Sequence, residues 1–239
     1  MSDLFDAVLE AHGGVERWRG FSRVRATIVT GGELFETKGL PQDPSPRQMT
    51  AALHDEWASV APFGAPDQRT DFTPGRIAVE KLDGTVVTER ADPRASFVGH
   101  ELATPWDPLH RAYFNGYAMW IYLTTPFVLT LPGVSVAEIE PMQEDDELWP
   151  GLQADFPPEI ATHSRFQEFY FGPDHLLRRH DYRVDVAGGF PAAQYVSGIV
   201  EADGFRVPTR RRAYHADRSG RPIRDRLMVS IDLSDVSFE

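Results

Sequence analysis

The segment 175–186 carries three polar side chains that could do chemistry together: Arg178, His180 and Tyr182. Residues two apart in a β-strand point to the same face, so this spacing places a cation, an imidazole and a phenol in one row. Imidazole titrates near neutral pH, and a phenol or guanidinium can stabilise developing negative charge. The row therefore predicts ligand contact, or proton transfer by His180 with help from Tyr182 or Arg178. The alternative is a structural row whose members hydrogen-bond one another.

A fourth candidate, His110, lies in a strongly aromatic segment in the middle of the chain. Asp107 followed by Pro108 is a typical helix start, because the carboxylate caps free backbone N–H groups and proline needs no N–H at the first position. Thr125 stands before a proline, and the residue before proline is pushed out of helical geometry. The sequence thus predicts a helix at about residues 107–124.

His110 could form a metal site together with His100 and Asp107. The capping role uses the carboxylate of Asp107, however, and the three groups have no recognised ligand spacing. We therefore predict no metal site. We expect His110 to line a pocket as a hydrogen-bonding group, or to move a proton in place of His180 if the pocket is catalytic.

The predicted helix is apolar on nearly every side, and such a helix must be buried. Many of its aromatic side chains carry a hydroxyl or an indole N–H, and these groups need partners when buried. A buried helix among strands indicates a lid over a curved sheet, with a ligand cavity between them. Simple core packing is the alternative. The expected ligand contacts are Trp106, His110, Tyr113, Tyr117 and Trp120 from the lid, with Arg178, His180 and Tyr182 from the sheet.

The rest of the chain alternates like β-strands joined by short turns, of which Asp83-Gly84 is a typical hairpin signal. Before these strands, apolar residues at helical spacing predict an N-terminal helix capped by Asp3 and interrupted at Gly13-Gly14. Sequential strands with tight turns pair antiparallel, so the fold class is mainly β, as one domain over residues 1–239. Strands are expected at 23–28, 34–40, 48–60, 77–82, 85–90, 134–139, 147–156, 162–171, 175–186, 193–201, 205–215 and 224–238.

The composition of the chain limits the partners and the cellular compartment that can be expected. The 239 residues include 36 acidic and 24 basic residues, a formal net charge of −12, which argues against a nucleic-acid partner. The absence of cysteine excludes disulfides and thiolate chemistry. No stretch approaches the roughly 20 apolar residues of a membrane span, so no stable membrane insertion is expected. The N-terminus lacks signal-peptide features, and the bias towards arginine over lysine is typical of high-GC bacteria, so we expect a cytoplasmic bacterial protein.

Nucleotide-binding, Rossmann, zinc-protease and α/β-hydrolase signatures are missing from the sequence, and no cofactor is predicted. Three stretches instead resemble the LolA/LolB/LppX-like lipoprotein-carrier superfamily: AHGGVERW (11–18), DGFRVPTRRRAY (203–214) and LMVSIDLSDVSFE (227–239). The resemblance implies an antiparallel, strongly curved sheet or half-barrel of about eleven strands, whose concave face holds an acyl or similar apolar chain beneath helices. It implies no catalytic residues.

Together these features predict a soluble protein that binds a hydrophobic small molecule or acyl chain between the curved sheet and the aromatic lid. The alternative hypothesis is a cofactor-free cyclase or isomerase acting on an apolar metabolite, with the histidine, tyrosine and arginine candidates in its cavity. A structural interaction module is a third and weaker interpretation.

Overall fold

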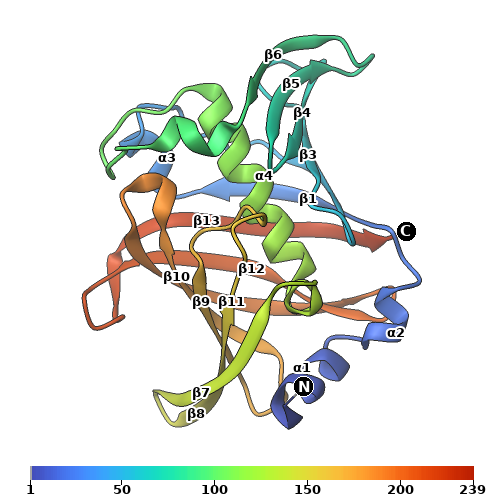
Figure 1. The fold of residues 1–239 in the computed structure, drawn as a ribbon, viewed down its shortest axis with the longest axis vertical. Helices are drawn as coiled ribbons and strands as arrows, with labels where there is room; N and C mark the ends of the chain where they lie inside the picture. Colours follow the sequence, from blue (N-terminus) through green and yellow to red (C-terminus); the bar gives the residue numbers. More distant parts are fainter. Residues whose placement is uncertain (1) are drawn as a thin grey trace.

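The computed structural model describes residues 2–239, and these form one large antiparallel sheet that curves around a central helix (Figure 1). Thirteen strands are present in the described residues, in the order β6-β5-β4-β3-β2-β1-β13-β12-β11-β10-β9-β8-β7. The predicted mainly β, strongly curved sheet with a helical lid is therefore confirmed. Its strands outnumber both the twelve expected from the alternation and the eleven or so implied by the resemblance.

Two meanders make up this sheet. The N-terminal arm contains β1 (Arg23–Gly31), β2 (Arg47–Ala52), β3 (Ala58–Ala61), β4 (Gln68–Thr73), β5 (Arg76–Lys81) and β6 (Val86–Ala91). The C-terminal arm contains β7 (Ser135–Glu144), β8 (Glu147–Asp155), β9 (Phe166–Phe171), β10 (Leu177–Val184), β11 (Phe190–Ala202), β12 (Phe205–Ala216) and β13 (Pro222–Phe238). The arms meet where β1 pairs with β13, with Ile28 opposite Leu233. The edges of the sheet are β6 and β7, so the half-barrel stays open between them.

The lid helix α4 (Pro108–Thr124) connects the two arms and lies inside the concave face (Figure 1). It packs mainly against β2 to β5 of the N-terminal arm. Its close approach depends on Gly116, because a Cβ atom there would lie 2.6 Å from Cβ of Phe72 on β4. No helix among residues 2–239 is both long enough and apolar enough to cross a bilayer.

Short helices close the ends of the half-barrel. They are α1 (Asp3–Ala11), α2 (Val15–Trp18), α3 (Leu34–Thr37), η1 (Pro93–Phe97), η2 (Phe127–Thr130) and η3 (Asp185–Ala187). The predicted break at Gly13-Gly14 separates α1 from α2. The predicted cap is wrong by one residue: Ser2, not Asp3, caps α1, and its Oγ accepts from Phe5 N at 3.3 Å.

Two predicted strands are wrong in kind or extent. The segment 34–40 begins as helix α3, because Leu34 and Phe35 are both buried and adjacent residues of a strand cannot face one core. The segment 48–60 is not one strand but the hairpin of β2 and β3, since its polar middle turns the chain back on itself. The predicted hairpin around Asp83-Gly84 is confirmed by the pairing of β5 with β6.

Candidate functional site

The lid begins with the predicted cap at Asp107, which forms a reciprocal capping box with His110. The carboxylate Oδ1 of Asp107 accepts from His110 N at 2.8 Å, and Asp107 N donates to Nδ1 of His110 at 3.1 Å. Arg90 on β6 also holds Asp107, with Nη2 2.6 Å from Oδ2. Because Nδ1 of His110 accepts a backbone N–H, this imidazole is part of the helix start. Its Nε2 is buried and has no partner among the described residues.

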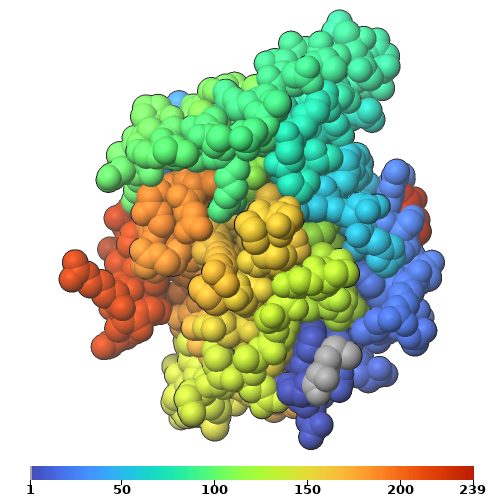
Figure 2. All heavy atoms as spheres, in the orientation of Figure 1, coloured from blue at the N-terminus to red at the C-terminus, as the bar shows by residue number. Residues whose placement is uncertain are grey.

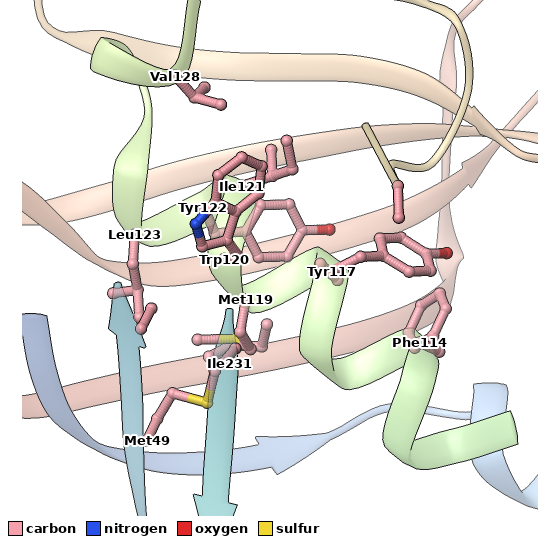
Figure 3. Packing of buried hydrophobic residues seen from close by; sticks show 14 of the residues in the cluster. Met49, Phe114, Tyr117, Met119, Trp120, Ile121, Tyr122, Leu123, Val128 and Ile231 are labelled. Carbon is pink, nitrogen blue, oxygen red and sulfur yellow. The ribbon is translucent and has the colours of Figure 1, made fainter. Parts of the chain in front are cut away.

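The lid aromatics lie inside the core rather than against an open cleft. Tyr113 and Tyr117 are 0% exposed, and Trp106 and Trp120 are also buried. Figure 3 shows Phe114, Tyr117, Trp120 and Tyr122 leaving α4 on different sides, with Met119 next to Met49 and Ile231. Trp120 Nε1 donates to the carbonyl of Ala52 at 3.0 Å and so joins the lid to β2. The hydroxyls of Tyr113 and Tyr117 have no hydrogen-bond partner within residues 2–239.

On β10 the structure keeps two of the three predicted row members together. His180 and Tyr182 are buried, with ring centroids 4.7 Å apart. The prediction that Arg178 shares this face is wrong, because a register shift between Leu177 and Arg179 turns its side chain away from His180 and Tyr182. Its guanidinium lies near the surface, where Nη2 pairs with Oδ2 of Asp174 at 2.7 Å. A bulge changes which residues share a face, and sequence alternation cannot show it.

Tyr182 belongs to a buried polar cluster that joins the lid to the C-terminal arm. Its hydroxyl lies 2.7 Å from the hydroxyl of Tyr122 on α4, which in turn lies 2.7 Å from Nε2 of His163. Gln194 on β11 donates to the Tyr182 hydroxyl at 3.2 Å. Arg211 on β12 donates to Oε1 of Gln194 at 2.9 Å and to the Tyr122 carbonyl at 2.6 Å.

His180 lies beside this cluster but has its own partners. Its Nε2 is 2.7 Å from Oε1 of Gln167, and its ring stacks on Phe169 with centroids 4.2 Å apart. The Nδ1 atoms of His180 and His163 are buried and have no partner in the described part of the chain. These two imidazoles therefore each leave one polar atom unsatisfied in the interior.

Burial sets the protonation of the cluster. Desolvation holds the pKa of His163 and of His180 well below the usual histidine value, so both rings are neutral at pH 7. Desolvation also raises the pKa of Tyr182 well above its usual value and that of Tyr122 to about 12. Neutral rings of very low basicity and strongly held phenol protons make poor proton carriers near neutral pH.

A loop covers the open face of the half-barrel above the lid. Residues 157–165 connect β8 to β9 and lie near the centre of the face in Figure 2. Two groups from the N-terminal side hold this loop: Oε2 of Glu56 accepts from Ala161 N at 3.0 Å, and Arg94 Nη1 donates to the Thr162 carbonyl at 2.7 Å. A cleft of about 520 Å³ beside the loop has a mixed lining, in which Arg94, Arg165 and Asp185 stand beside apolar residues such as Phe156 and Ile160.

A second cleft lies at the end of the lid and is mainly apolar, although Ser2, Arg19, His54 and Thr130 also line it. It measures about 530 Å³ and separates α1 and α2 from the segment that follows α4. In Figure 2 these two parts of the chain lie directly side by side. Trp18 stacks on Phe127 at its floor, with centroids 4.3 Å apart. Its apolar lining consists of Phe5, Val15, Trp18, Phe127, Leu129, Leu131, Val134 and Val136.

Sequence reasoning missed several members of these sites. Arg211 is the middle one of three consecutive arginines, and its inward position puts it against the lid. His163 was not among the predicted site residues, and it is fully buried. Glu56 lies in the middle of a segment expected to be one strand. In each case the signal is a tertiary contact rather than a local pattern.

No family model matches the chain, and no curated protein matches it. Solved structures match over nearly its whole length. A LolA superfamily protein from Nitrosomonas europaea is 14% identical, with 98% of this chain and 92% of that chain covered and a TM-score of 0.55. A DUF1329 family protein from Desulfovibrio piger is 11% identical, with 99% and 92% covered and a TM-score of 0.53. A putative outer membrane lipoprotein-sorting protein domain from Vibrio parahaemolyticus is 7% identical, with 98% and 92% covered and a TM-score of 0.55.

These comparisons correct one prediction and confirm another. The cytoplasmic location is wrong, because a structure of the same fold is named for outer membrane lipoprotein sorting, which points away from the cytoplasm. The resemblance inferred from the residues is confirmed at the level of architecture. The chain has a distant LolA-like fold.

Proposed function

We propose that this protein binds a hydrophobic small molecule or acyl chain, which enters through the apolar cleft at the end of the lid. The observation that carries the proposal is the cleft itself. Its volume of about 530 Å³ lies within the usual range of ligand sites, and eight of its twelve lining residues are apolar. Apolar lining loses water on binding, and each buried Å² of apolar area contributes roughly 25 cal/mol.

The packing of the lid supports a binding space between α4 and the C-terminal arm. Because α4 packs mainly on β2 to β5, its link to the other arm consists largely of side chains such as Tyr122 and His163. A ligand that separates these side chains leaves the sheet pairing intact. We propose that it then contacts the buried side chains Trp106, His110, Tyr113, Tyr117, Trp120, His180 and Tyr182.

The neighbours support the same class of ligand. One carries the LolA superfamily name, and another is named for lipoprotein sorting. In this protein the half-barrel encloses a large set of buried apolar side chains, which suits an apolar ligand. The cyclase or isomerase alternative has weaker support, since burial lowers the pKa of His180 and raises that of Tyr182.

The first test uses the uncharged fluorophore Nile red, whose emission rises in apolar surroundings. We expect saturable binding to the wild-type protein. Leu131→Asp and Val136→Asp should weaken it, because both side chains line the cleft and are only partly buried, so the fold tolerates the change. Val98→Asp is the matched control, because Val98 is 85% exposed and does not line this cleft. Unchanged binding in both cleft variants would refute the proposed entry site.

Native mass spectrometry of the purified protein, followed by solvent extraction, identifies the ligand class. A bound apolar molecule near one per chain supports the proposal. A protein that neither carries such a molecule nor binds Nile red contradicts it.

A further inference from the structure

Two buried arginines meet near the first turn of the lid, far along α4 from the apolar cleft. Arg47 is the first residue of β2 and is 3% exposed, and Arg111 of α4 is 7% exposed. Arg47 Nη2 donates to Thr30 Oγ1 at 2.6 Å, and Arg111 Nη1 donates to the Pro41 carbonyl at 2.8 Å. Arg111 thus contacts the loop that precedes β2, and Arg47 contacts the end of β1.

Several donors of this pair are unused. Arg47 Nε and Arg111 Nε and Nη2 are buried and have no hydrogen-bond partner among residues 2–239. The carboxylate that approaches them is Asp43, whose Oδ2 lies 3.9 Å from Arg47 Nε, beyond hydrogen-bond distance. The Asp43 side chain is 45% exposed, so two buried cations share one partly solvated anion.

Another buried arginine shows that the fold can pair such a group fully. Arg179 on β10 is as buried as Arg47, yet Asp181 binds it through two nitrogens at 2.7 Å each. Tyr195 and the Gly220 carbonyl accept from it as well, at 2.9 and 2.6 Å. Compared with Arg179, the pair Arg47 and Arg111 has spare charge and spare donors.

The electrostatic cost of this arrangement lowers the pKa values of both guanidinium groups. Burial, with the charge of Arg47 acting in the same direction, lowers the pKa of Arg111 to about 10. Burial also lowers the pKa of Arg47, against the attraction of Asp43. A bound anion would relieve both effects, because it supplies negative charge where water is excluded.

We propose that Arg47 and Arg111 form a binding site for one oxyanion, a carboxylate or a phosphate, at the N-terminal end of the lid. The unused guanidinium nitrogens donate to its oxygens, and Asp43 competes with it at the edge of the site. The ring centroid of Phe35 lies 4.3 Å from Cζ of Arg111 and 6.1 Å from the ring centroid of Phe114. The inner side of the site is therefore apolar. The anion is either free or the head group of an amphiphile. The site goes beyond the proposed apolar cleft and does not depend on it.

The test measures thermal unfolding and binding by calorimetry in a low-chloride buffer. The probes are inorganic phosphate, dodecanoate and uncharged dodecanol. We expect phosphate or dodecanoate to bind the wild type, and Arg111→Met and Arg47→Met each to weaken binding about tenfold or more, as for loss of a charged hydrogen bond. Asp43→Asn should bind several-fold more tightly, because the competing carboxylate is gone.

Arg212→Met is the control, because Arg212 pairs with Asp232 at 2.7 Å on the outer side and should bind like the wild type. Arg-dependent binding of phosphate assigns the site to a free anion. If dodecanoate binds much more tightly than phosphate or dodecanol, and this binding depends on the arginines, the site is assigned to the head group of an amphiphile. If neither the wild type nor the Asp43→Asn variant binds phosphate or dodecanoate, the proposal is overturned. This outcome holds even if Arg111→Met fails to fold. Equal binding of dodecanoate to wild type and Arg111→Met, without phosphate binding, also overturns it.

Discussion

Glu56 gives the sharpest test of how the covering loop is held. This residue lies in the turn between β2 and β3, and Oε2 accepts from Ala161 N at 3.0 Å. Its Oε1 is buried and has no partner in the described residues. Burial raises the pKa of Glu56 to about 8, although the Ala161 hydrogen bond and the Arg94 charge act in the opposite direction. The carboxyl is therefore mostly protonated at pH 7.

The sign of the pH dependence follows from linkage. The folded protein holds a proton on Glu56 up to about pH 8, whereas the unfolded chain loses it near the ordinary value of 4.5. The free energy of unfolding therefore falls as pH rises through this window, by at most about 5 kcal/mol. Screening by water at the turn reduces the effect, and we expect about 2 kcal/mol between the two ends of the window.

Glu56→Gln should remove this loss, because the amide oxygen still accepts from Ala161 N but carries no charge. The assay is urea denaturation followed by tryptophan fluorescence at about pH 4 and about pH 9, which lie outside the two ends of this window. At the higher pH the variant should be more stable than the wild type by about 2 kcal/mol, and the gap should nearly close at the lower pH. Asp55→Asn, in the same turn but exposed, is the matched control and should follow the wild type. Parallel stability curves for wild type and Glu56→Gln would refute the reasoning.

Three further substitutions test the lid and its contacts by the same denaturation assay. Asp107→Ala removes the helix cap and the ion pair with Arg90, and should cost about 1–2 kcal/mol; no loss would mean that the cap is dispensable. Gly116→Ala drives a methyl group into Phe72, and should cost about 1–3 kcal/mol; an unchanged midpoint would show that the lid can shift. Tyr182→Phe removes the hydroxyl shared by two hydrogen bonds, and should cost about 1–3 kcal/mol; a neutral result would argue against a structural role.

The parts of the fold that sequence predicted correctly are those with local signals. The lid at about residues 107–124 agrees with α4 at Pro108–Thr124, because Asp107-Pro108 starts it and the proline after Thr125 stops it. The curved antiparallel sheet also follows from local information, since tight turns between alternating segments leave few other pairings. The number of strands was predicted less well, because the segment 34–40 begins as a helix and the segment 48–60 forms two strands.

The site was less predictable because its members meet through tertiary contacts. His180 and Tyr182 were placed on one buried face correctly, but the bulge near Arg178 moved that residue to the surface. The cation that does reach the cluster is Arg211, and nothing in its local sequence distinguishes it from its two arginine neighbours. Glu56 contacts a residue 105 positions away, a pairing that only the closed half-barrel produces.

Several buried polar groups of the lid lack hydrogen-bond partners among the described residues, whereas a buried charged group of the sheet is fully paired. The charged network of Arg179 on β10 has its donors engaged, as a rigid sheet requires. The lid is different, because Tyr113, Tyr117 and Arg111 of α4 all carry buried polar atoms without a partner in the described chain. Each such atom costs about 1–3 kcal/mol that the folded state recovers only when a partner arrives. Strand residues such as His180 on β10 and Arg47 on β2 also carry such atoms. A ligand that satisfies the atoms of α4 stabilises the lid without changing the strand pairing.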